Sequence, residues 1–431
     1  MVDKKISGLG KNGWQAIRNG LLDIFLGIAI VIYGHRVPRV GYQLFFSYVF
    51  FSAIWSLFSR WFRPKALREN LWVTWAKILL SVILSNSLWL ENTTVYLFVF
   101  AIAFYQIFIA FVHLVTWYLY RKNAIKPRGR YLFDGLWIGW LGLYSLSPFH
   151  DAANFEFFLL GWYLVSLGIT RLRDGIFFEA DLSQNKLKRR IRVTLPIFMT
   201  ALIPASTLAK VNAFLQENVD ETANQAYNRM KDGKTAELEI FIHTSKTSLF
   251  SAIGHVDLCY NGRVISFGNY DPTSERFFGM IGDGVLYTCD RDKYIALCKR
   301  VSQKTLFGYG IDLTVKMEQA VQERLAEIEN LLIPWEPSDA ETAGADGVKG
   351  HSYAYLIQTE CNGKLYKFTD SKFKSYFVLS TNCVLLADSI IGQAGTDILS
   401  PKGFIAPGTY QSYLDDEYEK PHSLVVSKSI Y

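Results

Sequence analysis

Cysteine is scarce in this chain of 431 residues, and all five cysteines lie in its second half. Their number is odd and their spacing irregular, which excludes a disulfide framework, and no CxxC pair suggests a zinc site. Excess charge is also small. The net charge is +6, and the Lys and Arg residues fall in short loops between apolar runs, which is a sign of membrane topology. We therefore expect no metal, no cofactor and no nucleic-acid partner.

Charged residues are few in six apolar stretches before residue 175. Each stretch approaches the roughly 20 residues that a helix needs to cross a bilayer. A multi-pass α-helical membrane domain is therefore predicted for residues 1–175, without a cleavable signal, so that the first span stays as an anchor. The six predicted spans are about Ala16–Tyr33, Tyr42–Phe58, Leu71–Leu90, Thr94–Tyr120, Tyr131–Phe149 and Phe155–Thr170.

Basic residues gather at alternate ends of these stretches. They cluster before the first span, after the second, after the fourth and after the sixth, which predicts a cytoplasmic N-terminus and a cytoplasmic segment near residue 190. The linking region 176–236 then contains an uncharged run, Val193–Ala209, that favours a seventh span followed by a helical spacer. A seventh span would place residues 215–431 on the far side of the membrane. An interfacial helix on the cytoplasmic surface is the alternative.

The second half reads as an α+β domain, residues 237–431, with an antiparallel sheet. Glu237–His243, Ala252–Tyr260 and Arg263–Tyr270 are predicted strands, and Asn261-Gly262 is a strong signal for a tight hairpin. Pairing across that turn places His255 and Asp257 on one face of the sheet, together with Ser266 and Tyr270.

Further elements follow toward the C-terminus. Thr314–Leu332 has the apolar spacing of an amphipathic helix. His351–Gln358, Lys364–Thr369 and Phe377–Leu379 are predicted as strands. Asn382 is expected to cap a helix that runs to about Ile391 and ends at Gly392.

Cys383 is the candidate nucleophile because it opens that helix. The positive end of the helix dipole stabilises a thiolate, and a nearby histidine lowers the pKa of the thiol further. Cys259 shares a strand face with His255 but has no helix N-terminus, and Cys289, Cys298 and Cys361 lie in stretches without catalytic context. A small buried apolar residue is the plainer interpretation of any free cysteine.

Two motifs carry a resemblance to known families. Gly254-His255-Val256 on a strand, followed by Asn382-Cys383-Val384 at a helix start, resembles the circularly permuted NlpC-type, papain-like thiol domain of the lecithin:retinol acyltransferase relatives. More closely, residues 237–415 resemble a bacterial family implicated in lipoprotein N-acylation, through Phe267-Gly268-Asn269-Tyr270-Asp271 and Ile405-Ala406-Pro407. The membrane half loosely resembles the HdeD-type domain through Asn19–Gly27.

The resemblance implies a membrane-bound acyltransferase of a bacterial inner membrane, with its catalytic domain on the periplasmic face. Cys383 would be the nucleophile and His255 the base, with Ser266, Asn269 or Asp257 orienting the histidine. The implied acyl donor is a phospholipid of the bilayer, and the implied acceptor is the amine of a lipoprotein. No metal or cofactor is implied.

Two other functions fit the same residues. A cysteine peptidase or amidase acting on cell-wall peptides would use the same Cys–His chemistry with water as the acceptor. The second alternative is a membrane stress protein without enzymatic activity. His243, His351 and His422 have no metal-ligand spacing and are interpreted as surface or strand residues.

Overall fold

The computed structural model describes residues 11–62, 70–85, 88–146, 150–178, 192–194, 228–244, 254–301, 305–337, 341–343, 349–395 and 406–431. The chain forms two compact units. The first comprises Met1–Ile17, Val115–Gly129 and Arg173–Tyr431, and the second comprises Arg18–Leu114 and Arg130–Leu172. The division does not follow the apolar stretches, because the last turns of the fourth predicted span belong with the C-terminal half.

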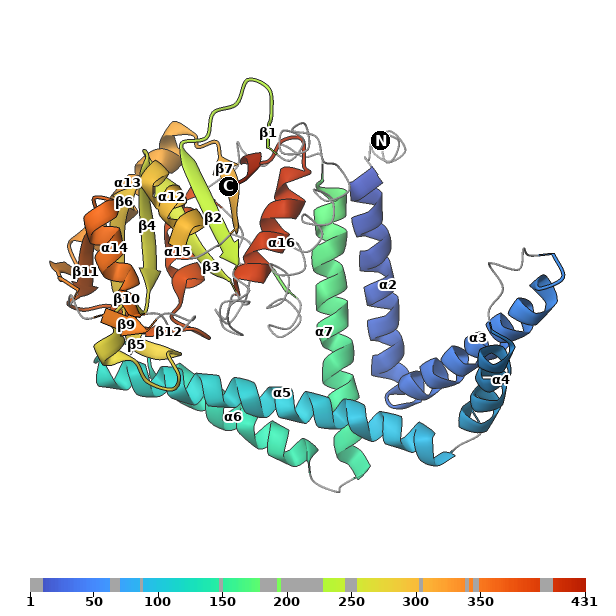
Figure 1. Ribbon diagram of the computed structural model, residues 1–431. Helices are drawn as coiled ribbons and strands as arrows, with labels where there is room; N and C mark the ends of the chain where they lie inside the picture. Colours follow the sequence, from blue (N-terminus) through green and yellow to red (C-terminus); the bar gives the residue numbers. More distant parts are fainter. Residues whose placement is uncertain are drawn as a thin grey trace. The chain divides into compact units, whose positions relative to one another are not determined.

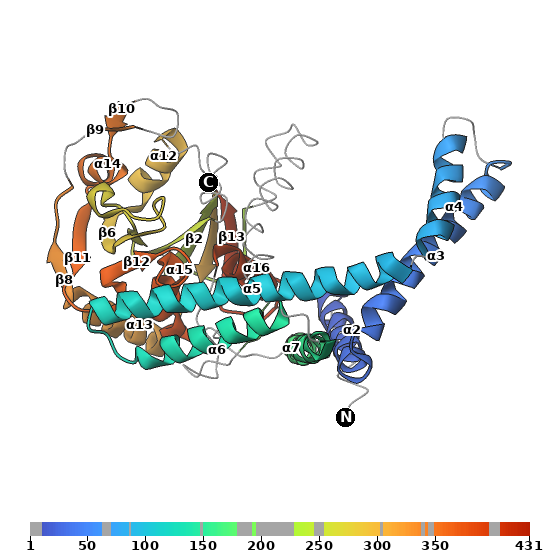
Figure 2. The ribbon, with the colours of Figure 1, turned by 90° about the horizontal axis from the view of Figure 1, so that it is seen from below.

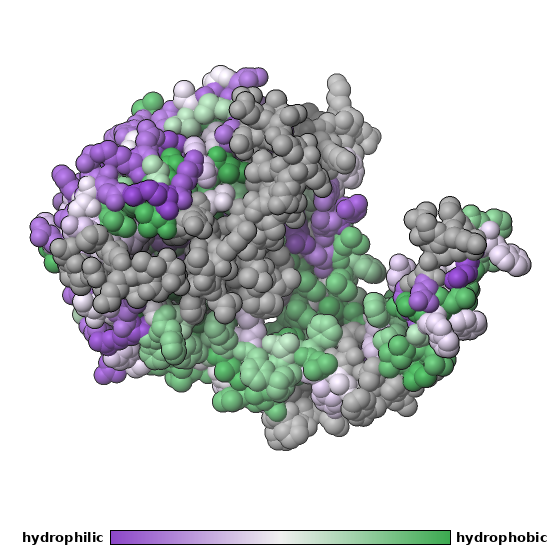
Figure 3. Space-filling view, viewed as in Figure 1, coloured by the Kyte–Doolittle hydropathy of each residue, from purple (hydrophilic) through white to green (hydrophobic). Residues whose placement is uncertain are grey.

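Six helices occupy the six apolar stretches, and hydrophobic residues cover much of their visible surface (Figure 3). Four of the helices are long and apolar enough to cross a membrane, over Gly13–Tyr33, Arg39–Ser59, Val95–Lys122 and Asn154–Ile176. The other two, α4 and α6, have 15 and 17 residues, fewer than the roughly 20 that a crossing needs. The helices are α2 (Lys11–Tyr33), α3 (Arg36–Ser59), α4 (Leu71–Ser85), α5 (Leu88–Lys122), α6 (Gly129–Ser145) and α7 (His150–Ile176).

Glycine allows two of these helices to meet along their backbones. A Cβ atom at Gly27 of α2 would come within 2.7 Å of the carbonyl oxygen of Gly161 in α7, and the same close approach holds for Gly20 and Gly168. Arg171 and Asp23 form an ion pair of 2.6 Å between the same two helices. Small residues at a helix interface and a paired charge are both typical of helices that pack in a bilayer.

An antiparallel sheet forms the centre of the C-terminal half (Figure 1). As far as the described residues show, it has nine strands in the order β1-β13-β7-β2-β3-β4-β6-β11-β8. A two-stranded ribbon of β5 and β12, and another of β9 and β10, lie outside it. The main strands are β1 (Arg229–Met230), β2 (Leu238–Thr244), β3 (His255–Tyr260), β4 (Arg263–Gly268), β6 (Val285–Asp290), β7 (Thr305–Ile311), β8 (Leu332–Pro334), β11 (Lys364–Phe368) and β13 (Val425–Ile430). The ribbons use β5 (Ile281–Asp283), β9 (Glu341–Ala343), β10 (Lys349–His351) and β12 (Ser375–Phe377).

Helices cover both faces of the sheet, so the domain has three layers (Figure 2). Alternation along β2 divides the core: Leu238, Ile240 and Ile242 face one layer, and Phe241 faces the other. The first layer holds α13 (Val315–Glu329), α15 (Cys383–Ile391) and α16 (Pro407–Tyr418), and the second holds α12 (Arg291–Val301) and α14 (Tyr353–Glu360).

Several predicted elements are confirmed. Asn261 and Gly262 have φ of 50° and 73°, the left-handed values of a tight hairpin turn, and Tyr260 pairs with Arg263 across it. The predicted helix over Thr314–Leu332 is α13, whose N-cap is Thr314. The predicted C-terminal α+β domain with an antiparallel sheet is present.

Other predictions were wrong or fall outside the described residues. Residues 353–360 form helix α14, not a strand, because the Ser352 side chain accepts a hydrogen bond from the Tyr355 N–H and Ala354 and Ile357 share a buried face. Residues 229–230 of the predicted helical spacer form β1. The predicted seventh span lies outside the described residues, apart from 193 and 194.

Candidate functional site

The start of α15 carries the candidate nucleophile. The side chain of Asn382 accepts a hydrogen bond from the N–H of Leu385 at 3.0 Å and donates one to the carbonyl of Val378 at 2.8 Å. The cap therefore fixes both the helix and the segment that leads into it. Cys383 occupies the first helical position, as predicted, where the free N–H groups of the first turn are directed toward the helix start.

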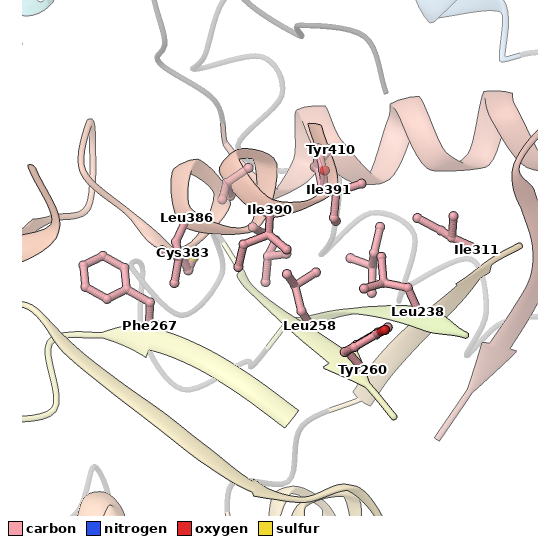
Figure 4. Close-up of a cluster of buried hydrophobic side chains, with 14 of the residues drawn as sticks. Leu238, Leu258, Tyr260, Phe267, Ile311, Cys383, Leu386, Ile390, Ile391 and Tyr410 are labelled. Carbon is pink, nitrogen blue, oxygen red and sulfur yellow. The ribbon is translucent and has the colours of Figure 1, made fainter. Parts of the chain in front are cut away.

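The surroundings of Cys383 are apolar. Its side chain lies in the core cluster beside Phe267 and Leu386 (Figure 4), and only 2% of the residue is exposed. Tyr376 of β12 is a further neighbour, linked to the thiol by a side-chain hydrogen bond. A substrate carbonyl reaches this sulfur only when the covering side chains move, and an aliphatic chain suits these walls better than a polar peptide does.

His255, at the start of β3, interacts with Cys383. Burial lowers the pKa of the imidazole, but the charge of Cys383, the carboxylate of Asp257 and hydrogen bonds to both groups raise it to about 10. The side chain remains 19% exposed. A pKa of about 10 keeps the ring of His255 protonated at neutral pH, so the ring places a positive charge beside the sulfur of Cys383.

Polar side chains surround the Nε2 atom of His255. Asp257 Oδ1 lies 3.0 Å from it, the hydroxyl of Tyr270 3.0 Å and the hydroxyl of Ser266 3.1 Å. Ser266 and Tyr270 are also 2.8 Å apart. This is the face that the hairpin register predicts. Burial and the charge of Asp257 raise the pKa of Tyr270 well above 10, so that its hydroxyl stays protonated and able to donate.

Asp257 is a buried carboxylate with several partners. Burial alone would raise its pKa, but His255 and His243 hold it well below the ordinary value of 3.8. Its Oδ2 atom accepts hydrogen bonds from Nε2 of His243 at 2.6 Å and from the hydroxyl of Tyr294 at 2.5 Å. The carboxylate is therefore ionised and anchored on one side while its other oxygen faces His255.

His243 and Tyr294 are members of this network that the sequence did not reveal. His243 is buried and pairs with His255 across β2 and β3, so its interpretation as a surface or plain strand residue misses its partner. Alternation along β2 is the signal that points to it, because His243 lies two residues after Phe241 and therefore on the same face of the sheet. Tyr294 comes from α12, and nothing in the sequence links that helix to the strands.

Asn269, the remaining orienting candidate, has a different neighbour. Its Nδ2 donates to the carbonyl of Gly279 at 3.3 Å. Its Oδ1 lies so close to Gly282 that a Cβ atom on that glycine would be only 2.1 Å from it. It braces the loop between residues 276 and 281. Of the three candidates, the structure brings Ser266 and Asp257 to the histidine.

Three of these residues could in principle hold a metal ion, since ligand atoms of His243, His255 and Asp257 lie within 4.8 Å of one another. The distances fit hydrogen bonds better. Two ligands of a tetrahedral zinc ion stand about 3.3 Å apart, given bonds of about 2.0–2.1 Å. His243 Nε2 and Asp257 Oδ2 are only 2.6 Å apart, which leaves no room for an ion between them.

Searches of protein-family models, of curated proteins and of solved structures each find nothing that matches this chain. The chemical interpretation therefore depends on the site alone.

Proposed function

We propose that the chain is a membrane-bound thiol acyltransferase of papain-like type. Cys383 takes a fatty acyl group from a phospholipid and passes it to an amine. The observation that carries the proposal is the meeting of a cysteine at a helix start with a histidine of raised pKa and a buried carboxylate. Such a set forms covalent acyl intermediates, because it supplies a nucleophile, a proton carrier and an orienting group.

In the first half-reaction, the Cys383 thiolate attacks the ester carbonyl of the lipid. The tetrahedral intermediate collapses, the C–O bond to the lyso-lipid breaks, and the His255 imidazolium gives its proton to the departing oxygen. Nε2 of His255 is directed to Asp257, Ser266 and Tyr270, which leaves Nδ1 for this transfer. Backbone N–H groups at the start of α15 stabilise the oxyanion, at typically about 2.7–4 kcal/mol per donor.

In the second half-reaction an amine attacks the thioester. The neutral imidazole of His255 accepts the proton of the amine, the amide bond forms, and Cys383 leaves as the thiolate beside an imidazolium. The starting state is restored without a metal or an oxidant. Asp257 stays ionised throughout, because two further hydrogen bonds hold its Oδ2 atom.

The apolar surroundings of the thiol favour this reaction over hydrolysis of cell-wall peptides. Phe267, Leu386 and Tyr376 line the sulfur, and an acyl chain makes dispersion contacts there without losing hydrogen bonds. The acceptor that the resemblance implies is the N-terminus of a bacterial lipoprotein at the periplasmic face.

The proposal is tested by incubating the protein in nanodiscs with phospholipid and measuring its intact mass. An acyl adduct on Cys383 that hydroxylamine removes supports it. Hydrolysis of a cell-wall peptide without an acyl adduct would favour the peptidase. The absence of both the acyl adduct and peptide hydrolysis would favour a non-enzymatic protein.

A further inference from the structure

Two phenylalanines stand exposed at the tip of a tight loop. The loop is closed by Arg276 and Ile281, whose backbones pair with N···O distances of 2.8 and 3.2 Å. Phe277 and Phe278 lie between them, 61% and 95% exposed. Adjacent bare aromatic rings of this kind on a soluble surface mark an interaction site, since each costs hydration free energy.

The backbone of this loop is strained as well. Phe277, Phe278 and Gly279 have φ of 50°, 56° and 80°. The left-handed region costs roughly 1–2 kcal/mol for a residue with a side chain, and bulky residues seldom adopt it. Asn269 holds the strained loop in place through its contact with the Gly279 carbonyl. Both the strain and the exposure are unfavourable in water, so another environment must account for the two rings.

The loop is joined to the segment that leads to Cys383. Strand β5 begins at Ile281 and pairs with β12, with Ile281 opposite Phe377. The N–H of Val378 donates to the carbonyl of Met280 at 3.0 Å, and the N–H of Phe377 donates to the carbonyl of Thr381 at 3.1 Å. The two exposed rings therefore sit at the end of the domain where the nucleophile enters α15.

A membrane helix meets the domain at this same end. The last turns of α5 belong to the same compact unit as the sheet. The hydroxyl of Thr116 donates to Oγ of Ser380 at 2.9 Å, three residues before Cys383, and Nδ2 of Asn123 donates to Oγ of Ser375 at 2.8 Å. Thr116 precedes Lys122, the last residue of the candidate span, by about 9 Å at a rise of 1.5 Å per residue.

That end of α5 is the basic one. Arg121 and Lys122 occupy its last turn, and Lys126 and Arg128 follow in the next loop, a pattern that marks the cytoplasmic side. Basic residues also follow the end of α7, which places that end on the same side of the membrane. Asp174 of α7 pairs with Arg192, and the Arg192 guanidinium lies 5.1 Å over the ring of Tyr413 in α16, all within the same unit.

We propose that Phe277 and Phe278 form a finger that inserts into the membrane. Together with the C-terminal turns of α5, the finger docks the part of the domain that holds Cys383 on one leaflet, the leaflet at the basic ends of α5 and α7. This is the cytoplasmic leaflet, the opposite side from the one expected with a seventh span. The proposal deepens the acyltransferase function and rests on it for the substrate. The phospholipid acyl donor comes from the cytoplasmic leaflet, and the acceptor is an amine on that side instead of a lipoprotein N-terminus.

Lipid contact is tested by photo-crosslinking in nanodiscs of phosphatidylglycerol and phosphatidylcholine. A benzophenone amino acid replaces Phe278, which is 95% exposed, in one protein, and Val315 on α13, which is 82% exposed, in the control. A phospholipid adduct at position 278 at least about tenfold more abundant than at 315 supports the finger, given that burial of one phenylalanine is worth more than 1.4 kcal/mol. Equal adducts at both positions overturn it.

The side is tested with single cysteines and a membrane-impermeant maleimide. Both variants carry Cys383→Ala, and the other four native cysteines are buried, so Val315→Cys in the domain and Arg128→Cys in the basic loop are the reactive thiols. In right-side-out and inverted vesicles, both variants are expected to react in the same preparation. Labelling of the two in opposite preparations overturns the proposal.

The role of the finger in turnover is tested with Phe277→Asn/Phe278→Asn. Asparagine tolerates the left-handed backbone, so the loop keeps its shape. We expect acylation of Cys383 from bilayer phospholipid to fall at least about tenfold, while acylation from a short-chain soluble ester is unchanged; equal rates from the bilayer overturn the finger. Crosslinking and labelling need no catalysis, so a protein that passes both and never acylates Cys383 fails only the proposed function.

Discussion

Asp257 Oδ2 lies 2.6 Å from Nε2 of His243, a side chain on the neighbouring strand β2, and this contact anchors the carboxylate whose other oxygen faces His255. Neither residue of the pair is exposed. A buried carboxylate stays ionised only with partners, and here two histidines and a tyrosine supply them. His255 therefore lies against a carboxylate that is itself held by a second histidine.

Replacement of His243 tests this anchor. His243→Ala leaves Oδ2 with one donor fewer in a buried site, which is expected to lower the free energy of unfolding by about 1–3 kcal/mol and to slow acylation of Cys383. The measurement is denaturant unfolding of the sheet domain in detergent, beside the acylation rate. Tyr294→Phe is the matched control, because it removes the other donor to Oδ2 without opening a cavity. Wild-type stability and rate in both variants would contradict the account.

The protonation of His255 gives a pH prediction. Burial lowers its pKa, but Cys383 and Asp257 raise it from 6.5 to about 10. A raised pKa means stability that is fully present below pH 6.5 and lost as the pH rises through about 10. NMR titration of the labelled imidazole should show a charged ring at pH 8. Cys383→Ala removes the largest contribution that raises the pKa of His255, so this pKa must fall in the variant. An unchanged titration would show that Cys383 does not interact with His255.

The cap of α15 should matter more for chemistry than for stability. Asn382→Ala removes a cap worth about 1 kcal/mol and also frees the segment at Val378. Thr314→Ala is the matched control, since Thr314 caps α13 in the same way. Similar losses of stability are expected from both, with slower acylation only in Asn382→Ala. Equal acylation rates would show that the cap does not position Cys383.

Thiol reactivity should single out Cys383. Burial raises the pKa of Cys259 to about 12 and of Cys361 to about 11, and it also raises the pKa of Cys289. Iodoacetamide at pH 7.5 is therefore expected to modify Cys383 first, as read by peptide mass mapping. His255→Ala should slow that modification at least about tenfold, because the sulfur loses the positive charge beside it. Faster modification of any other cysteine would count against the assignment.

Local signals in the sequence account for much of this domain. The left-handed turn at Asn261-Gly262 sets the hairpin register, and the Asn382 cap sets the start of α15, so both depend on neighbours a few residues away. The hairpin alone is enough to bring Ser266 toward His255. These features are predictable because the chain around them decides the geometry.

The rest depends on packing between distant segments. His243 joins Asp257 through the pairing of β2 with β3, and Tyr294 reaches the same carboxylate from α12, which no local pattern indicates. Residues 353–360 have the aromatic and apolar content of a strand, but the Ser352 cap and the packing of Ala354 and Ile357 make them a helix. The attachment of Thr116 to Ser380 spans 264 positions of the sequence and is equally hidden from it.

The most direct measurement is the intact mass of the protein after incubation with a phospholipid of defined acyl chain in nanodiscs, read before and after hydroxylamine. We expect one acyl group per chain, located on Cys383, released by hydroxylamine, and missing from both Cys383→Ala and His255→Ala. An unmodified mass in the folded wild-type protein, or an acyl group that persists in Cys383→Ala, would contradict it.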